Sequence, residues 1–311
     1  MAVSLDDPKI ASRRALCADI SASATEPLGA TASRVDNWIL VEYRGLWSRD
    51  VLGDSLLSAE LKAHLRDQLA RLPHSRILFV KKPERRPDPR RRVFFGSSRE
   101  GEERFYGLEF ERHEDLLSLD FVSALRDSGV PGVPLDHPLF VVCTHGKRDR
   151  CCAKYGHQLY DRLCAETEPT WVWQATHVGG DRFAGNVVCL PEGLYFGRVG
   201  EDDVAPLVAS YLEGEIDMEH YRGRSAYTFA VQAAERLVRE TVGLRGIDSV
   251  ALGGVHATDG GWTVALTTPD HAYEVDVVSE LSEEPIFLTC SAATPQRARR
   301  FVATGHRARP R

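Results

Sequence analysis

Short apolar runs of strand length alternate with amphipathic segments along the first 125 residues. The runs typical of strands are residues 38–43, 77–80, 93–95 and 106–110. Leucines at helical spacing favour helices over residues 56–72 and 116–125. After the second strand, KKPERRPDPRRR favours a solvated surface loop, because proline cannot sit in a central strand. Alternating strands and helices predict that this part of the chain is α/β.

A second pattern begins after DSGVPGVPLDHP, residues 127–138, where the density of Gly and Pro predicts a domain boundary. Beyond it, strands are expected at residues 139–142, 171–175, 187–190 and 194–199. Helices are expected over residues 157–166 and 204–212, and the segment CTHGKRDRCCAKYG between the first strand and the first helix is expected to be a loop. This order of elements is that of the thioredoxin fold.

The last part of the chain predicts a helix and a small antiparallel unit. The helix is expected over residues 226–242, and the strands at 250–252, 262–266, 273–277 and 286–288, with a turn at Asp259-Gly260-Gly261. The basic tail RARRFVATGHRARPR is expected to be loose, and the first 33 residues are expected to be partly a flexible lead-in. We therefore predict three domains, at residues 1–135, 136–220 and 221–311.

Charge and hydropathy narrow the choice of cell compartment and partner. The net charge of −6 argues against a general nucleic-acid binder, which would usually be basic. No stretch approaches the roughly 20 continuous apolar residues that a membrane span needs. The first 20 residues lack the apolar core of a signal peptide. The sequence therefore predicts a cytoplasmic protein that binds neither nucleic acid nor membrane.

Seven cysteines are spread through the chain, and three of them fall within ten residues. An odd count in a long chain favours a reducing compartment over a disulfide framework. Cys17, Cys164, Cys189 and Cys290 are interpreted as apolar fillers, which is what most lone buried cysteines are. The cluster at Cys143, Cys151 and Cys152 needs another explanation.

Two pairs of potential ligands follow two neighbouring predicted strands. Cys143 ends a strand, and Cys152 comes after eight intervening residues. His177 ends the next strand, and Asp181 follows across Gly179-Gly180, where glycines allow a sharp turn. Thiolates are soft ligands that suit iron-sulfur clusters, zinc or copper. The pattern predicts a four-ligand metal site.

The segments CTHGKRDRCC, HVGGDRFAGN and LPEGLYFGRV resemble the sucrase/ferredoxin-like family of thioredoxin-like ferredoxins. The resemblance is strongest over residues 139–200 and extends more weakly upstream to EPLGATASRVDNWILVE. Family members hold a 2Fe-2S cluster with two cysteines of a C-x8-C loop and two histidines of an H-x3-H turn. The resemblance thus implies a thioredoxin-like ferredoxin domain at residues 136–220, flanked by an N-terminal α/β domain and a small α+β C-terminal unit.

Carried over by position, the resemblance implies Cys143, Cys152 and His177 as ligands of a 2Fe-2S cluster. The family's second histidine is replaced here by Asp181. Three alternatives stay open for the fourth ligand: Asp181 through its carboxylate oxygen, Cys151 as a third sulfur, or no protein ligand. We favour Asp181, because it sits in register with the family's histidine and the residues around it match.

These observations predict a one-electron carrier rather than a catalyst, although enzymatic activity is left open. Its partners would be redox proteins, with a reductase as donor and an unknown acceptor, since no G-x-G-x-x-G motif follows a strand to bind a nucleotide cofactor. Two alternatives are a thiol-redox protein and a zinc-binding structural module using the same four residues. The thiol-redox alternative lacks the C-x-x-C motif that thioredoxin-type enzymes use.

Overall fold

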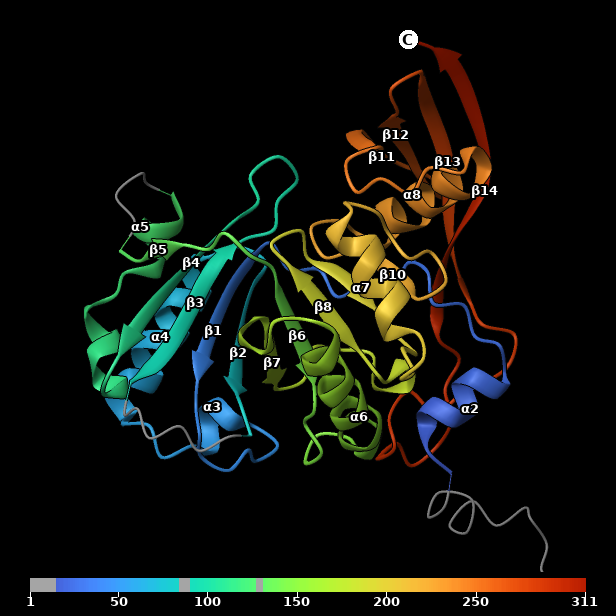
Figure 1. The fold of residues 1–311 in the computed structure, drawn as a ribbon. Helices are drawn as coiled ribbons and strands as arrows, with labels where there is room; N and C mark the ends of the chain where they lie inside the picture. Colours follow the sequence, from blue (N-terminus) through green and yellow to red (C-terminus); the bar gives the residue numbers. More distant parts are fainter. Residues whose placement is uncertain (1–14, 84–89, 127–130) are drawn as a thin grey trace, which may run out of the picture.

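The computed structural model describes residues 15–83, 90–126 and 131–311, and it contains two β-sheets with helices around them (Figure 1). The larger sheet has ten strands in the order β10-β9-β8-β6-β7-β2-β1-β3-β4-β5, and the smaller has four in the order β11-β12-β13-β14. The predicted α/β character is confirmed at this level. Part of the predicted loop at residues 81–92 and part of the boundary at 127–138 lie outside the described residues.

The first half of the chain builds one side of the large sheet. Its strands are β1 (Asn37–Glu42), β2 (Ser75–Lys81), β3 (Arg91–Ser97), β4 (Arg104–Phe110) and β5 (Val133–Pro134). Its helices are α2 (Cys17–Ser23), α3 (Val51–Asp54), α4 (Ala59–Arg71), η1 (His113–Ser118) and α5 (Phe121–Arg126). Strand β1 pairs parallel with β2 and antiparallel with β3. The predicted elements of this half are therefore found close to their expected positions.

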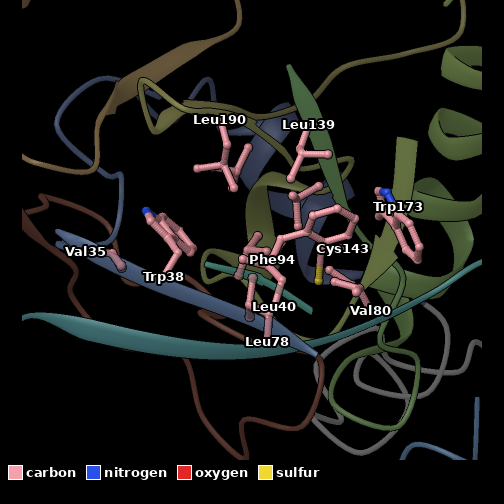
Figure 2. Packing of buried hydrophobic residues seen from close by; sticks show 14 of the residues in the cluster. Val35, Trp38, Leu40, Leu78, Val80, Phe94, Leu139, Cys143, Trp173 and Leu190 are labelled. Carbon is pink, nitrogen blue, oxygen red and sulfur yellow. The ribbon is translucent and has the colours of Figure 1, made fainter. Parts of the chain in front are cut away.

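Strand β1 is buried on both faces because every residue of NWILVE lies in the interior. Side chains alternate between the two faces of a strand, so Trp38 and Leu40 join one core cluster and Ile39 and Val41 join another. Figure 2 shows the first cluster, in which Cys143 packs with apolar residues of both halves of the chain. The core thus crosses the middle of the sheet without a break.

The second half of the large sheet follows from residue 139 onward. Its strands are β6 (Leu139–Cys143), β7 (Val172–Ala175), β8 (Val187–Leu190), β9 (Leu194–Phe196) and β10 (Tyr221–Arg224). Its helices are α6 (Arg150–Glu166), η2 (Pro169–Trp171), η3 (Asp181–Phe183) and α7 (Val204–Leu212). It joins the first half where β7 pairs antiparallel with β2. The thioredoxin-like layout and the three domains stay predictions.

Helix α8 (Phe229–Val242) packs against the smaller sheet. The strands of this sheet are β11 (Ala251–Thr258), β12 (Gly261–Thr267), β13 (His271–Leu281) and β14 (Arg299–Pro310). Two expectations are wrong here: residues 286–288 form no strand, and the basic tail is not loose. The tail forms β14 and pairs along β13 from end to end, with Arg307 beside Glu274 and Asp276 on the exposed face.

Two helices begin earlier than the sequence predicted or were not predicted at all. Helix α6 begins at Arg150, seven residues before the predicted start, because the Asp149 side chain caps it by accepting a hydrogen bond from the Cys151 N–H. Cys151 and Cys152 therefore lie in a helical turn and not in a loop. Residues 17–23, expected within a partly flexible lead-in, form helix α2, in which Cys17 is buried. None of the helices in the described parts of the chain combines the length and apolar character that crossing a membrane requires.

Candidate metal centre

The candidate site lies at the carboxyl ends of two parallel neighbours, β6 and β7. Cys143 is the last residue of β6 and pairs with Ala175, the last residue of β7. His177 follows β7 by two residues. Parallel strands end at the same edge of a sheet, so Cys143 and His177 are delivered to one place. This is the convergence that the sequence predicted.

Cys152 reaches the same place from the first turn of α6. The helix packs closely on the end of β6 at Gly156, where an added Cβ would collide with the Cys143 carbonyl oxygen. A residue without a side chain is therefore needed at this crossing. The close approach brings the buried side chain of Cys152 to the buried side chain of Cys143.

The turn between His177 and Asp181 contains two glycines in left-handed backbone conformations. Gly179 has φ of 106° and Gly180 has φ of 82°. The buried guanidinium of Arg222 donates hydrogen bonds to the Gly179 carbonyl oxygen at 3.0 Å and to Asn186 Oδ1 at 2.7 Å. The predicted sharp turn is confirmed, and Arg222 holds it in place.

Three donor atoms converge in this pocket. The sulfurs of Cys143 and Cys152 and a ring nitrogen of His177 all lie within 4.8 Å of one another. Asp181, only 4% exposed, lies beside them. Its Oδ1 is 2.9 Å from His177 Nδ1 and accepts a hydrogen bond from Cys152 Sγ at 3.3 Å. All four residues predicted from the sequence are therefore neighbours in space.

Contacts within the pocket shift the pKa values of its members. The hydrogen bond from Cys152 is the largest influence on Cys143 and, with the nearby imidazole of His177, holds the pKa of the Cys143 thiol well below its usual value despite burial. The same contact and burial raise the pKa of Cys152. Burial lowers the pKa of His177, but Asp181 and the Cys143 sulfur outweigh it and raise the value to about 9. The contact between Cys143 and His177 thus favours the thiolate form of Cys143 and the protonated form of His177.

This donor set suits a metal that prefers sulfur and nitrogen ligands. His177 Nδ1 is buried and has no hydrogen-bond partner of good geometry, although Asp181 is close. Coordination of a thiophilic metal would use the imidazole and both sulfurs and would replace the protons that they share. The residues present therefore fit a Cys/His metal site.

Cys151 does not belong to this pocket. Successive residues of a helix point about 100° apart, so Cys151 and Cys152 face different surroundings. The Cys151 sulfur lies 3.5 Å from the sulfur of Cys17 and 3.3 Å from that of Cys290. The interpretation of Cys17 and Cys290 as isolated fillers is wrong for that reason. Nothing local in the sequence signals this second group, since Cys17 and Cys290 are 273 residues apart.

A comparison with protein families identifies the chain. The family model described as sucrase/ferredoxin-like matches residues 28–223, which is well over half of the sequence. The chain belongs to the sucrase/ferredoxin-like family. The matched residues contain Cys143, Cys152, His177 and Asp181 but neither Cys17 nor Cys290. No solved structure gives a significant match.

Several curated fungal proteins are similar to part of this family member, and they share the name Altered inheritance of mitochondria protein 32. The one from Meyerozyma guilliermondii is 36% identical over 95 residues, which are 27% of this chain and 34% of the relative. The one from Eremothecium gossypii is 30% identical over 109 residues, which are 30% of this chain and 34% of the relative. The chain thus spans about a third of the length of the relatives it matches.

These comparisons correct the function predicted from the sequence. The electron-transfer role is contradicted, because the curated relatives are named for the inheritance of mitochondria and not as electron carriers. The family assignment is confirmed, and the structure contains a Cys/His group that can bind a metal ion. The predicted cytoplasmic location and redox partners stay predictions.

Proposed function

We propose that this chain is a metal-binding protein whose centre is held by Cys143, Cys152 and His177, with Asp181 as the fourth ligand. The observation that carries the proposal is the convergence of two sulfurs and an imidazole nitrogen within 4.8 Å. They come from the end of β6, the start of α6 and the turn after β7, three segments separated in the sequence.

We further propose that the centre is a 2Fe-2S cluster on a thioredoxin-like fold. Support for the fold comes from the element order β6-α6-β7-β8-β9-α7 within the family match. Support for the cluster comes from the mixed donor set, since two thiolates on one side and non-sulfur ligands on the other can share a diiron unit, as in Rieske centres. Such a cluster supplies a redox-active iron pair.

Asp181 suits the fourth ligand position because it is buried and because metal binding would remove one of its hydrogen-bond donors. It accepts a hydrogen bond from the Cys152 thiol at 3.3 Å. Metal binding requires cysteine as thiolate, so the Cys152 proton leaves when the site is filled. Asp181 would then lose that donor, and Oδ1, which also faces His177 Nδ1 at 2.9 Å, would have a lone pair available for a metal.

Metal content of the purified full chain tests the proposal. We expect iron and acid-labile sulfide in equal amounts after anaerobic purification, visible absorption, and an EPR signal on reduction. Cys143→Ala and His177→Ala should lose the iron, and Asp181→Ala should lose most of it. Cys164→Ala changes a cysteine of α6 outside the pocket and serves as the matched control, which should keep its iron.

Two results would contradict parts of the proposal separately. If the pocket bound only zinc, and Cys143→Ala removed that zinc, the proposed metal site would be supported but the proposed 2Fe-2S cluster would be wrong. If iron and zinc contents were the same in Cys143→Ala, His177→Ala and wild type, the metal-binding function itself would be wrong.

A further inference from the structure

Three cysteine sulfurs from distant parts of the chain, one of them that of Cys151, lie close together outside the Cys143 pocket. Cys17 comes from α2, Cys151 from the first turn of α6, and Cys290 from the segment between β13 and β14. Their sulfurs are 3.5, 3.3 and 3.6 Å apart. The carboxylate of Asp149 completes the group, and one ligand atom from each residue lies within 4.8 Å of all the others.

We propose that Cys17, Cys151, Cys290 and Asp149 form a second metal site, which takes Zn²⁺ as a structural ion. It is separate from the Cys143 pocket, and it does not depend on what that pocket binds. Two of its four residues lie outside the segment that the family match covers, since Cys17 precedes residue 28 and Cys290 follows residue 223, whereas Asp149 and Cys151 lie within it.

The spacing of the sulfurs is close to what zinc needs. With Zn–S bonds of about 2.3 Å, tetrahedral geometry places the sulfurs about 3.8 Å apart. The observed spacings of 3.3 to 3.6 Å fall slightly short of this, so an ion would need only small outward movements of the side chains. A disulfide would need an S–S distance of about 2.05 Å and would leave the third sulfur unpaired.

Asp149 is positioned as a fourth ligand by two backbone amides. Its Oδ1 accepts a hydrogen bond from the Cys151 N–H at 2.9 Å, and its Oδ2 accepts one from the Cys290 N–H at 2.7 Å. Both oxygens are 4.0 Å from the Cys17 sulfur. Each carboxylate oxygen has a further lone pair, so it can keep its amide partner and still bind an ion.

Backbone amides also point at the sulfurs, as expected around metal-bound thiolates. The Cys17 N–H donates to Cys290 Sγ at 3.5 Å, and the Ala18 N–H donates to Cys151 Sγ at 3.4 Å. Outer hydrogen bonds of this kind orient ligands and stabilise their charge. Cys17 and Cys151 are buried, whereas Cys290 is partly exposed beside a small pocket that Cys17, Ile20 and Phe287 help to line. An ion can therefore enter from that side.

A zinc ion here would connect helix α2 and the segment before β14 to helix α6. In Figure 1, the blue helix α2 and the red segment before β14 lie together near α6. The contact between Cys17 and Cys290 closes a loop of 273 residues. Because α6 also carries Cys152, the ion would support the first turn of the helix that serves the Cys143 pocket.

Zinc analysis of the purified full chain, with extended X-ray absorption at the zinc edge, tests the site. We expect one zinc per chain with three sulfur neighbours at about 2.3 Å. Cys290→Ala and Cys17→Ala should each lose this zinc. Cys164→Ala and Cys143→Ala should retain it, which separates failure of this site from failure of the Cys143 pocket.

A second measurement uses the wild-type chain, so it tests the site even if the cysteine variants fail to fold. Alkylation followed by mass spectrometry should find Cys17, Cys151 and Cys290 protected in the zinc-loaded protein and labelled after treatment with a chelator. The proposal is overturned if Cys290→Ala keeps its zinc, if chelation leaves the labelling unchanged, or if the unreduced protein contains a disulfide between any two of the three cysteines.

Discussion

At the scale of single residues, the Cys143 pocket depends on a backbone position that only glycine fills without strain. A Cβ on Gly180 would meet the guanidinium of Arg222. That guanidinium cannot move aside freely, because it is buried and donates hydrogen bonds to the carbonyl oxygens of Thr31 at 2.7 Å and Gly179 at 3.0 Å. The turn that carries His177 and Asp181 is therefore sensitive to one added carbon.

We expect Gly180→Ala to destabilise the protein more than Gly214→Ala. Both glycines have similar positive φ, 82° and 77°, so each alanine costs about 1–2 kcal/mol of backbone strain. A Cβ on Gly214 meets nothing within 4 Å, whereas one on Gly180 meets Arg222. Overpacking adds about 1–3 kcal/mol. Urea unfolding of both variants measures the difference, and equal losses would contradict the role of Arg222.

At the scale of elements, helix α6 links the two groups of candidate ligands. Its first turn sends Cys151 to one group and Cys152 to the other. The Asp149 cap sets where the helix starts, and the Gly156 crossing sets how near it lies to β6. A small change in the packing of this helix therefore changes the distance between Cys143 and Cys152.

Gly156→Ala tests the packing of α6, because the expected change in stability is opposite to the change that helix propensity alone predicts. In an unconstrained helix interior, Gly→Ala stabilises by roughly 0.5–1 kcal/mol. Here the new methyl group would overlap the Cys143 carbonyl oxygen, so we expect a net loss of about 1–3 kcal/mol and lower metal retention. Thermal unfolding and metal analysis check both, and a stabilised variant would show that α6 does not need its close approach.

At the scale of the whole molecule, the second sheet is completed by the end of the chain. Strand β14 covers the edge of β13 along its full length, and Phe301 packs near Trp262 and Phe229. Without β14, the backbone groups of β13 would become an open edge, which favours aggregation. The tail is thus a structural strand, although its composition is basic and polar.

Deletion of residues 299–311 should lower the unfolding midpoint and increase aggregation. Arg307→Ala, which removes an exposed ion pair with Glu274 and Asp276 but keeps the strand, should change the midpoint little. Differential scanning calorimetry and light scattering compare the two variants. A truncated chain as stable and monodisperse as the wild type would mean that β14 contributes nothing to the fold.

The sequence alone was sufficient to predict most strands and the convergence of the residues in the Cys143 pocket, because both depend on short-range patterns. Apolar runs specify buried strands wherever they occur, and ligands placed just after two parallel neighbours must meet at one edge of the sheet. His177 and Asp181 were found from their spacing and from the glycines between them. The family assignment was also correct, since its motifs are contiguous.

Other features were decided only by tertiary structure, because their causes are far apart in the chain. Strand β14 forms since β13 offers a pairing edge, and its own residues carry little strand signal. Cys17 and Cys290 resemble isolated apolar fillers until folding brings them to Cys151. Local periodicity describes which face of an element is buried, whereas a group of ligands from distant segments exists only after the elements have packed.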